Sequence, residues 1–142
     1  MAIVKKRAEV TIDRPVTDIW ARIGDFADLS WFPGMRTELC KSDDIIRSVT
    51  KDDWNFVMKQ RLIEHDDKRH TYSYDLPDIM DFEAVAGAGK IVQVLNGILA
   101  VTPTGVSQSV VTWDLETEDF LIHGSHVEHQ KALDTLKEEM EA

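Results

Sequence analysis

The sequence has few of the features needed for disulfide cross-linking or membrane insertion. Cys40 is the single cysteine among its 142 residues, so no disulfide can form within the chain, and a reducing compartment is indicated. No apolar run approaches the roughly 18 residues of a membrane span, and no apolar signal segment follows Met1. We therefore expect a cytoplasmic protein with no membrane span.

Positive charge is scarce in the second half of the chain. Residues 72–142 contain 13 Asp and Glu but only 3 Lys and no Arg, whereas residues 1–71 contain 13 residues of each sign. The whole net charge of −10 therefore lies in the second half. An acidic surface repels phosphate backbones and anionic lipid surfaces, so we expect no nucleic-acid partner. The simplest interpretation of this charge is a solvated face that aids solubility.

Motifs of several catalytic classes are also missing. The chain contains no G-x-S-x-G motif and no phosphate-binding loop, and the Gly-Ala-Gly at residues 87–89 lacks the rest of a nucleotide-binding fingerprint. Cys40 has no partner motif of the kind that holds zinc. We therefore predict no metal site and no cofactor.

What the chain does contain fits one domain over residues 1–142. Its hydrophobic content of 43% and charged content of 30% are ordinary for a globule that buries one core. Six or seven strands are predicted by alternation of polar and apolar residues, at 4–13, 36–40, 45–50, 54–62, 69–76, 91–102 and 107–117. Their short polar turns are typical of an antiparallel meander, and with the helices described next they predict an α+β fold.

The stretch from Ile12 to Met35 predicts two short helices. Pro15 suits the first helical position, and Gly24 suits a helix end. Apolar residues recur between them at helical spacing, at Val16, Ile19, Trp20 and Ile23. The second short helix is expected from a cluster of large apolar residues, Phe26, Leu29, Trp31, Phe32 and Met35.

Two regions allow alternative interpretations. Residues 78–90 break the strand rhythm and predict either a mobile lid or an ordered loop that covers a sheet edge. The C-terminal helix begins at His126 if Ser125 and Glu128 form a capping box, or near Glu118 if it starts earlier. In both cases one stripe of the helix contains His126, His129, Leu133, Leu136 and Met140.

Several segments together resemble the START-like (SRPBCC) superfamily, in particular its polyketide cyclase/dehydrase and lipid-transport branch. These segments are RPVTDIWARIGDFADLSWFPGM, Arg47 in IIRSV, RLIEHD, HTYSYDL and the hairpin VTPTGVSQSVVTW. The resemblance implies a helix-grip fold, in which a curved antiparallel sheet of six or seven strands wraps around a long C-terminal helix. Two short helices would follow the first strand.

The first functional hypothesis is the binding of a small hydrophobic or aromatic molecule between the sheet and the last helix. Large side chains would line a cavity there with a few polar groups among them. The alternative is that the same aromatic residues fill a solid core. The candidate ligand-binding residues are Trp20, Phe26, Trp31, Phe32, Met35, Trp54, Phe56, Met58, Gln60, Tyr72, Tyr74, Trp113, His126, His129 and Leu133.

The second hypothesis is an enzyme of the polyketide cyclase/aromatase type, which would catalyse an aldol condensation or a dehydration. His126, His129, Tyr72 and Tyr74 would then exchange protons with the substrate. The same four side chains could instead make structural hydrogen bonds, so the sequence leaves open whether the protein is an enzyme. Arg47 could face either side of the sheet.

The oligomeric state is also left open, as monomer or homodimer. A third possibility, a partner-binding module, depends only on the adjacent aromatics Trp31 and Phe32.

Overall fold

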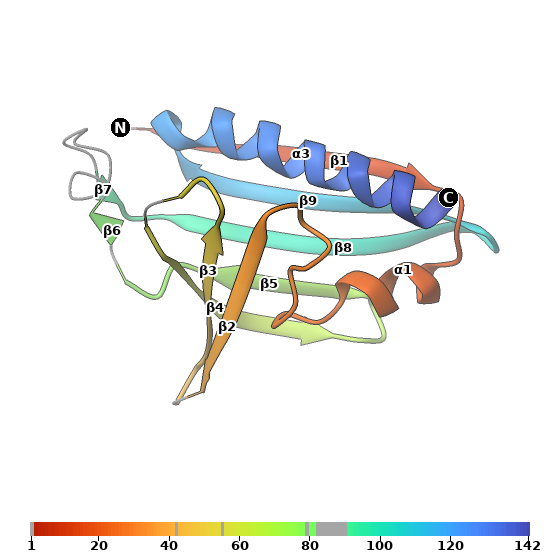
Figure 1. The fold of residues 1–142 in the computed structure, drawn as a ribbon, viewed down its shortest axis with the longest axis horizontal. Helices are drawn as coiled ribbons and strands as arrows, with labels where there is room; N and C mark the ends of the chain where they lie inside the picture. Colours follow the sequence, from red (N-terminus) through yellow and green to blue (C-terminus); the bar gives the residue numbers. More distant parts are fainter. Residues whose placement is uncertain (1, 42, 55, 79, 82–90) are drawn as a thin grey trace.

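The computed structural model describes residues 2–41, 43–54, 56–78, 80–81 and 91–142. It contains a curved antiparallel sheet of seven strands with a long helix laid against one side (Figure 1), so the predicted α+β helix-grip fold is confirmed. The strands of this sheet are β1 (Ile3–Ile12), β2 (Met35–Lys41), β3 (Ile45–Lys51), β4 (Met58–Asp66), β5 (Thr71–Asp75), β8 (Leu95–Gly105) and β9 (Gln108–Glu118). The helices are α1 (Val16–Ile23) and α3 (Asp119–Glu141), and β6 (Met80–Asp81) pairs with β7 (Ile91–Val92) in a separate ladder.

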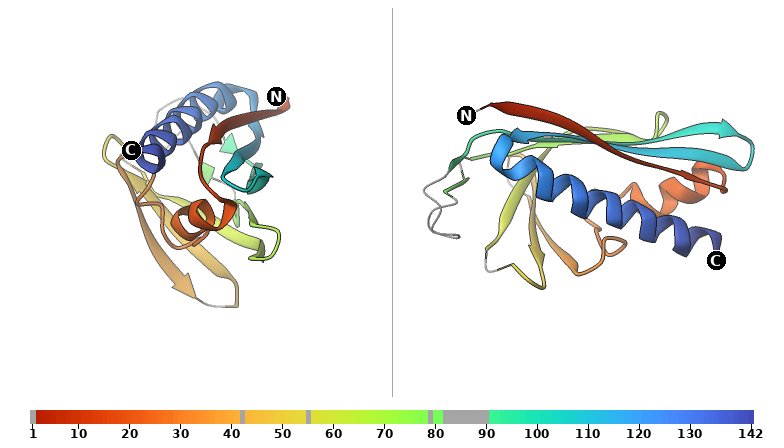
Figure 2. Two further views of the ribbon diagram at one scale, coloured as in Figure 1. Left: turned by 90° about the vertical axis from the view of Figure 1, so that its right-hand side faces the viewer. Right: turned by 90° about the horizontal axis from the view of Figure 1, so that it is seen from above.

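The strand order is β1-β9-β8-β5-β4-β3-β2, so the first and last strands of the chain lie side by side at one edge. Every neighbouring pair in the sheet is antiparallel. The sheet curves around α3 (Figure 2), which packs mainly against β1 and β9. This arrangement leaves β2, β3 and β4 facing the helix across the interior.

Helix α1 forms where the sequence predicts it. Its apolar face buries Ile19 and Ile23, and Pro15 precedes it in extended conformation. Gly24 ends the helix with a φ of −77°, so left-handed backbone is not the reason for glycine at this position. A Cβ on Gly24 would instead collide with the indole of Trp20, which lies directly over it.

The second predicted short helix is wrong: residues 26–34 form consecutive turns. Aspartate side chains compete with helical hydrogen bonding here, because Asp25 accepts from the backbone N–H of Ala27 at 2.9 Å and Asp28 from that of Ser30 at 2.8 Å. Hydrogen bonds from Ser30 also hold the pKa of Asp28 below its usual value. The apolar residues of the segment are nevertheless buried, as predicted, at Phe26, Leu29, Trp31 and Phe32.

Helix α3 begins at Asp119, so the earlier of the two predicted starts is confirmed and the capping box at Ser125 is wrong. The helix follows β9 without a connecting loop, and the first free N–H, on Asp119, donates to the carbonyl of Ala2 at 3.0 Å. The carboxylate of Glu118 accepts from the backbone N–H groups of Gln93 and Val94 instead of capping the helix.

Two predicted strands also change their bounds. Strand β4 begins at Met58 and not at Trp54, because Trp54 N donates to Lys51 O at 2.9 Å in a turn. The strand predicted over 91–102 divides into β7 and β8. Between them lie Gln93 and Val94, whose backbone N–H groups donate to Glu118. The predicted lid falls mostly on residues 79 and 82–90, which lie outside the described residues.

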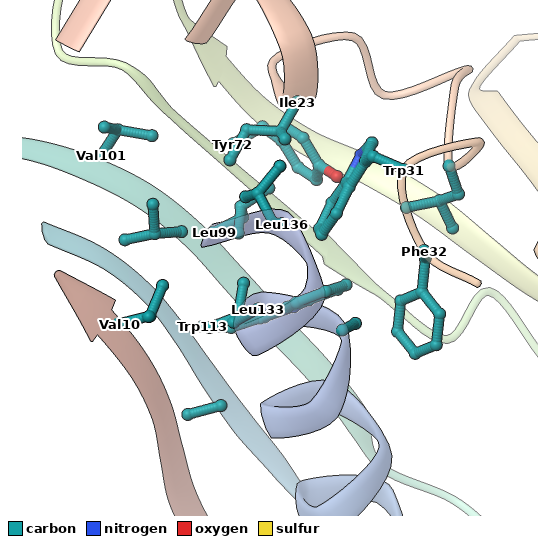
Figure 3. Close-up of a cluster of buried hydrophobic side chains, with 14 of the residues drawn as sticks. Val10, Ile23, Trp31, Phe32, Tyr72, Leu99, Val101, Trp113, Leu133 and Leu136 are labelled. Atoms are coloured by element: carbon teal, nitrogen blue, oxygen red, sulfur yellow. The ribbon is translucent and has the colours of Figure 1, made fainter. Parts of the chain in front are cut away.

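The closely packed part of the interior lies under the C-terminal half of α3. Figure 3 shows Leu133 and Leu136 of this half directed toward apolar residues of β1, β8 and β9. The following side chains of this part of the core are almost fully buried: Val10, Ile23, Tyr72, Leu99, Val101, Trp113, Leu133 and Leu136. The solid core predicted as the alternative to a cavity therefore exists at this end.

Candidate functional site

The other end of the interior is hollow. A cavity of about 590 Å³ lies between the N-terminal half of α3 and the facing strands. Helix α3 contributes residues from Phe120 to His129, and Trp113 and Leu115 of β9 form the adjoining wall. Because a curved sheet and a straight helix diverge along their length, the same two elements that close the core at Leu133 separate here.

Most of the predicted ligand-binding side chains line this cavity. They are Phe32, Met35, Trp54, Phe56, Met58, Gln60, Tyr74, Trp113 and His129. Trp54 and Phe56 stack on each other with centroids 4.6 Å apart and planes 15° apart. Both lie before β4 in an irregular segment, and both are partly exposed. Their role as ligand contacts stays a prediction.

The remaining candidates lie elsewhere. Phe26, Trp31, Tyr72 and Leu133 are buried in the packed core. Trp20 is partly buried against the core, and its indole N–H donates to Asp67 at 2.9 Å. The structure therefore brings together only part of the predicted set, because alternation identifies which residues point inward but not which end of the interior they reach.

The sequence left the direction of Arg47 open, and the structure places it fully buried. Burial alternates along β3, so Arg47 and Val49 point inward. Gln60 lies directly opposite Arg47 on β4. The guanidinium Nε donates to Gln60 Oε1 at 2.7 Å, and Nη1 donates to the carbonyl of Phe26 at 2.8 Å and to Tyr72 Oη at 3.3 Å. Because inward and outward positions alternate along β3, the position of Arg47 two residues before Val49 was the signal that could have shown that Arg47 points inward.

The positive charge of Arg47 is surrounded by aromatic rings and has no acidic partner in the part of the chain that the structure describes. Its Cζ lies 4.2 Å from the ring centre of Phe26, 4.9 Å from that of Tyr74 and 5.6 Å from that of Tyr72. No described Asp or Glu forms an ion pair with it, and the buried Nη2 has no hydrogen-bond acceptor among these residues. Ring faces offset the charge only partly.

The two candidate tyrosines each have a hydrogen-bond partner within the protein. Tyr74 Oη accepts from the indole N–H of Trp113 at 2.9 Å, and burial raises the pKa of Tyr74 to about 12. Tyr72 Oη accepts from Arg47. A phenol with a pKa this high does not release its proton near neutral pH.

The two candidate histidines on α3 contact different parts of the protein. His126 faces β1, with Nε2 3.0 Å from the carbonyl of Arg7, and does not line the cavity. His129 lines it, and its ring packs edge-to-face on Trp113 with centroids 4.2 Å apart. Its Nδ1 must donate to the carbonyl of Ser125, 2.6 Å away, because that oxygen can only accept. Burial lowers the pKa of His129 to about 4, so the ring is neutral near pH 7 and Nε2 is an acceptor.

Charged residues gather at the more exposed end of the cavity. Lys51 forms ion pairs with Asp53 at 2.8 Å and Glu128 at 3.5 Å, and Glu116 pairs with Lys5 at 3.6 Å. In the part of the chain that the structure describes, no group of three or more His, Cys, Asp or Glu is arranged to hold a metal ion. Neither described helix is both long and apolar enough to cross a bilayer.

Comparison with known protein families identifies the family to which this chain belongs. Residues 4–141 match the family model described as polyketide cyclase / dehydrase and lipid transport. The chain belongs to this family. The predicted resemblance is thereby confirmed over nearly the whole chain. No curated protein matches the sequence.

Several solved structures have a similar fold over almost the full length of this chain. An uncharacterized protein from Bacillus thuringiensis has a TM-score of 0.77 and 20% identity, with 98% of this chain and 100% of that chain covered. The Zhui aromatase/cyclase from Streptomyces has a TM-score of 0.70 and 11% identity, with 96% and 93% covered. Norcoclaurine synthase from Thalictrum flavum, in complex with dopamine and hydroxybenzaldehyde, has a TM-score of 0.68 and 15% identity, with 96% and 86% covered. At these identities the likeness shows a shared fold.

Proposed function

We propose that the protein binds a small hydrophobic or aromatic molecule in the cavity between the sheet and the N-terminal half of α3. The observation that carries this proposal is the cavity of about 590 Å³, whose wall is mostly apolar surface from aromatic and aliphatic side chains, with polar and charged residues among them. This volume lies within the usual range of about 300–1,000 Å³ for small-molecule sites.

The contrast between the two ends of the interior supports the proposal. Leu133 and Leu136 are fully buried against the sheet, whereas Trp54 and Phe56 line the cavity and remain partly exposed. Side chains that line a hollow forgo packing contacts, and an apolar ligand restores them. The norcoclaurine synthase structure, which has the same fold, holds two aromatic molecules, and this favours an aromatic ligand here too.

A cyclase-type enzyme is the second candidate, because the family includes cyclases and the fold is shared with an aromatase/cyclase. A cavity histidine in contact with a tyrosine or carboxylate would favour acid–base catalysis. His129 is bonded to the carbonyl of Ser125 and Tyr74 to Trp113, and no described His–Tyr or His–Asp pair lines the cavity. The geometry therefore favours binding over catalysis.

The test is a titration with the neutral fluorescent dye N-phenyl-1-naphthylamine. We expect saturable binding to the wild type with one dye per chain, and a dissociation constant about tenfold higher for Trp54→Ala, which removes a stacked ring from the wall. Val57→Ala is the matched control, because Val57 is exposed and does not line the cavity. Absence of saturable binding, or equal affinity in all three proteins, would contradict the proposal.

A further inference from the structure

From the polar groups at the buried end of the cavity, we infer that the ligand is an aromatic carboxylate whose anionic group is bound by Arg47 and Gln60. This inference rests on the proposed function and adds the chemical class of the ligand and its orientation. It depends on hydrogen-bond donors that the protein leaves without a good acceptor.

Arg47 supplies the first of these donors. A guanidinium has five N–H groups, and here Nε and Nη1 are used by Gln60, Phe26 and Tyr72. Nη2 is buried and has no acceptor among the described residues, although Arg47 is a wall residue of the cavity. A buried charged donor without an acceptor is unfavourable, so this position calls for an acceptor oxygen.

Gln60 supplies the second donor. It is 7% exposed and lines the same end of the cavity, and its Oε1 is used by Arg47. The hydrogen bond that Oε1 accepts orients the amide so that Nε2 points away from Arg47, and among the described residues Nε2 has only the sulfur of Met58 as acceptor, at 3.5 Å. A thioether is a weak acceptor, so this N–H is also available to a stronger one.

The charge distribution favours an anion over a neutral carbonyl. Arg47 is completely buried, and the carboxylates that line the cavity are already engaged near solvent, Asp53 and Glu128 by Lys51 and Glu116 by Lys5. The Asp53 and Glu128 side chains are 72% and 46% exposed and pair with Lys51, not with the buried guanidinium. A carboxylate has two oxygens for the two donors and cancels the charge.

These positions define an orientation for the ligand. The carboxylate lies between β3 and β4 at Arg47 and Gln60, and the aromatic body extends past Trp113 and toward the stacked pair Trp54 and Phe56. The sulfur of Met58, which also lines the cavity, lies 3.5 Å from Gln60 Nε2. Because its thioether side chain is flexible, Met58 can move aside and give the carboxylate access to this donor.

The test compares 2-naphthoate with 2-naphthamide, which has nearly the same shape and a carbonyl oxygen but no charge. Each is titrated against bound N-phenyl-1-naphthylamine at pH 7.5. We expect the wild type to bind naphthoate about 10- to 100-fold more tightly than naphthamide, as for a charge-assisted hydrogen-bonded pair. In Arg47→Met we expect this ratio to fall at least tenfold, and in Gln60→Leu to fall less.

Arg61→Met is the matched control, because Arg61 is on the neighbouring strand but points outward to Asp75, 2.7 Å away. The ratio should not change in this variant. A ratio that falls in Lys51→Met and not in Arg47→Met would place the anion at the exposed end and overturn the inference.

If Arg47→Met does not fold, the wild type still decides the question. The side-chain ¹H–¹⁵N resonances of Arg47 should shift with naphthoate and not with naphthamide. Equal affinities for the two compounds, or no shift, would overturn the inference while dye binding still supports the proposed function. Failure of the dye itself to bind would overturn the proposed function separately.

Discussion

At the scale of single residues, burial decides what each ionisable side chain does. Arg47 and His129 both line the cavity, and both are held by hydrogen bonds to backbone carbonyls. Arginine stays charged under any burial, so Arg47 can attract an anion. Histidine loses its proton when it is desolvated, so His129 offers the cavity a neutral acceptor.

The lowered pKa of His129 predicts weaker folding in mild acid. Its folded pKa is about 4 and its unfolded value 6.5, so between these values only the unfolded chain binds the proton. The free energy of unfolding therefore falls as the pH decreases through 6.5 toward 4, by about 1–2 kcal/mol between pH 7.5 and 5. Urea unfolding at both pH values should show this loss, and His129→Gln should remove most of it. The exposed His123 is the control: a similar effect of His123→Gln would disprove the assignment.

At the scale of elements, pairing between strands decides where the large aromatic residues can lie. Tyr74 of β5 is paired with Gly97 of β8, and the Tyr74 ring lies over that glycine while its hydroxyl accepts from Trp113. The register between β5 and β8 therefore provides the space that the ring occupies. In the same way β9 leads directly into α3, so the β1–β9 pairing also positions the helix.

Gly97→Ala should be strongly unfavourable for this reason. A Cβ at position 97 would overlap the Tyr74 ring, which is buried and held at its hydroxyl by Trp113. We expect a loss of about 1–3 kcal/mol in the free energy of unfolding, measured by urea denaturation. Gly105→Ala is the control, since a Cβ there meets nothing within 4 Å. Equal stability of the two variants would show that the contact is unimportant.

Gly124→Ala should have the opposite effect. Gly124 lies inside α3, is exposed, and a Cβ there meets nothing within 4 Å. Alanine is favoured over glycine in a helix interior by about 0.5–1 kcal/mol, so we expect a gain of this size in urea unfolding. A loss of stability would mean that the helix start needs the flexibility of glycine.

At the scale of the whole molecule, the curvature of the sheet relative to α3 produces one closed end and one open end. Leu133 and Leu136 close the interior toward the C-terminus of α3, and the cavity lies toward its N-terminus. A ligand there contacts both the helix and the sheet, so it stabilises the folded state as a whole.

Ligand binding should therefore raise the melting temperature. At a free dye concentration of 100 times the dissociation constant, the gain is about 2.7 kcal/mol. For a chain of 142 residues this corresponds to a shift on the order of 5–10 °C, measurable by scanning calorimetry with N-phenyl-1-naphthylamine. Trp54→Ala should show a smaller shift at the same concentration, and an unchanged melting temperature in the wild type would argue against binding.

The sequence by itself determined the type and order of most elements, because alternation in strands and the apolar spacing of α1 are local patterns. It also determined that Tyr72, Tyr74 and Trp113 point inward. The turns of residues 26–34 also have a local cause, because Asp25 and Asp28 accept from backbone N–H groups two residues further along. Tertiary structure alone decided that α3 starts at Asp119, where Ala2 supplies an acceptor. It also decided which inward residues border a cavity and which fill the core, because that depends on where a curved sheet and a helix diverge, which no single segment encodes.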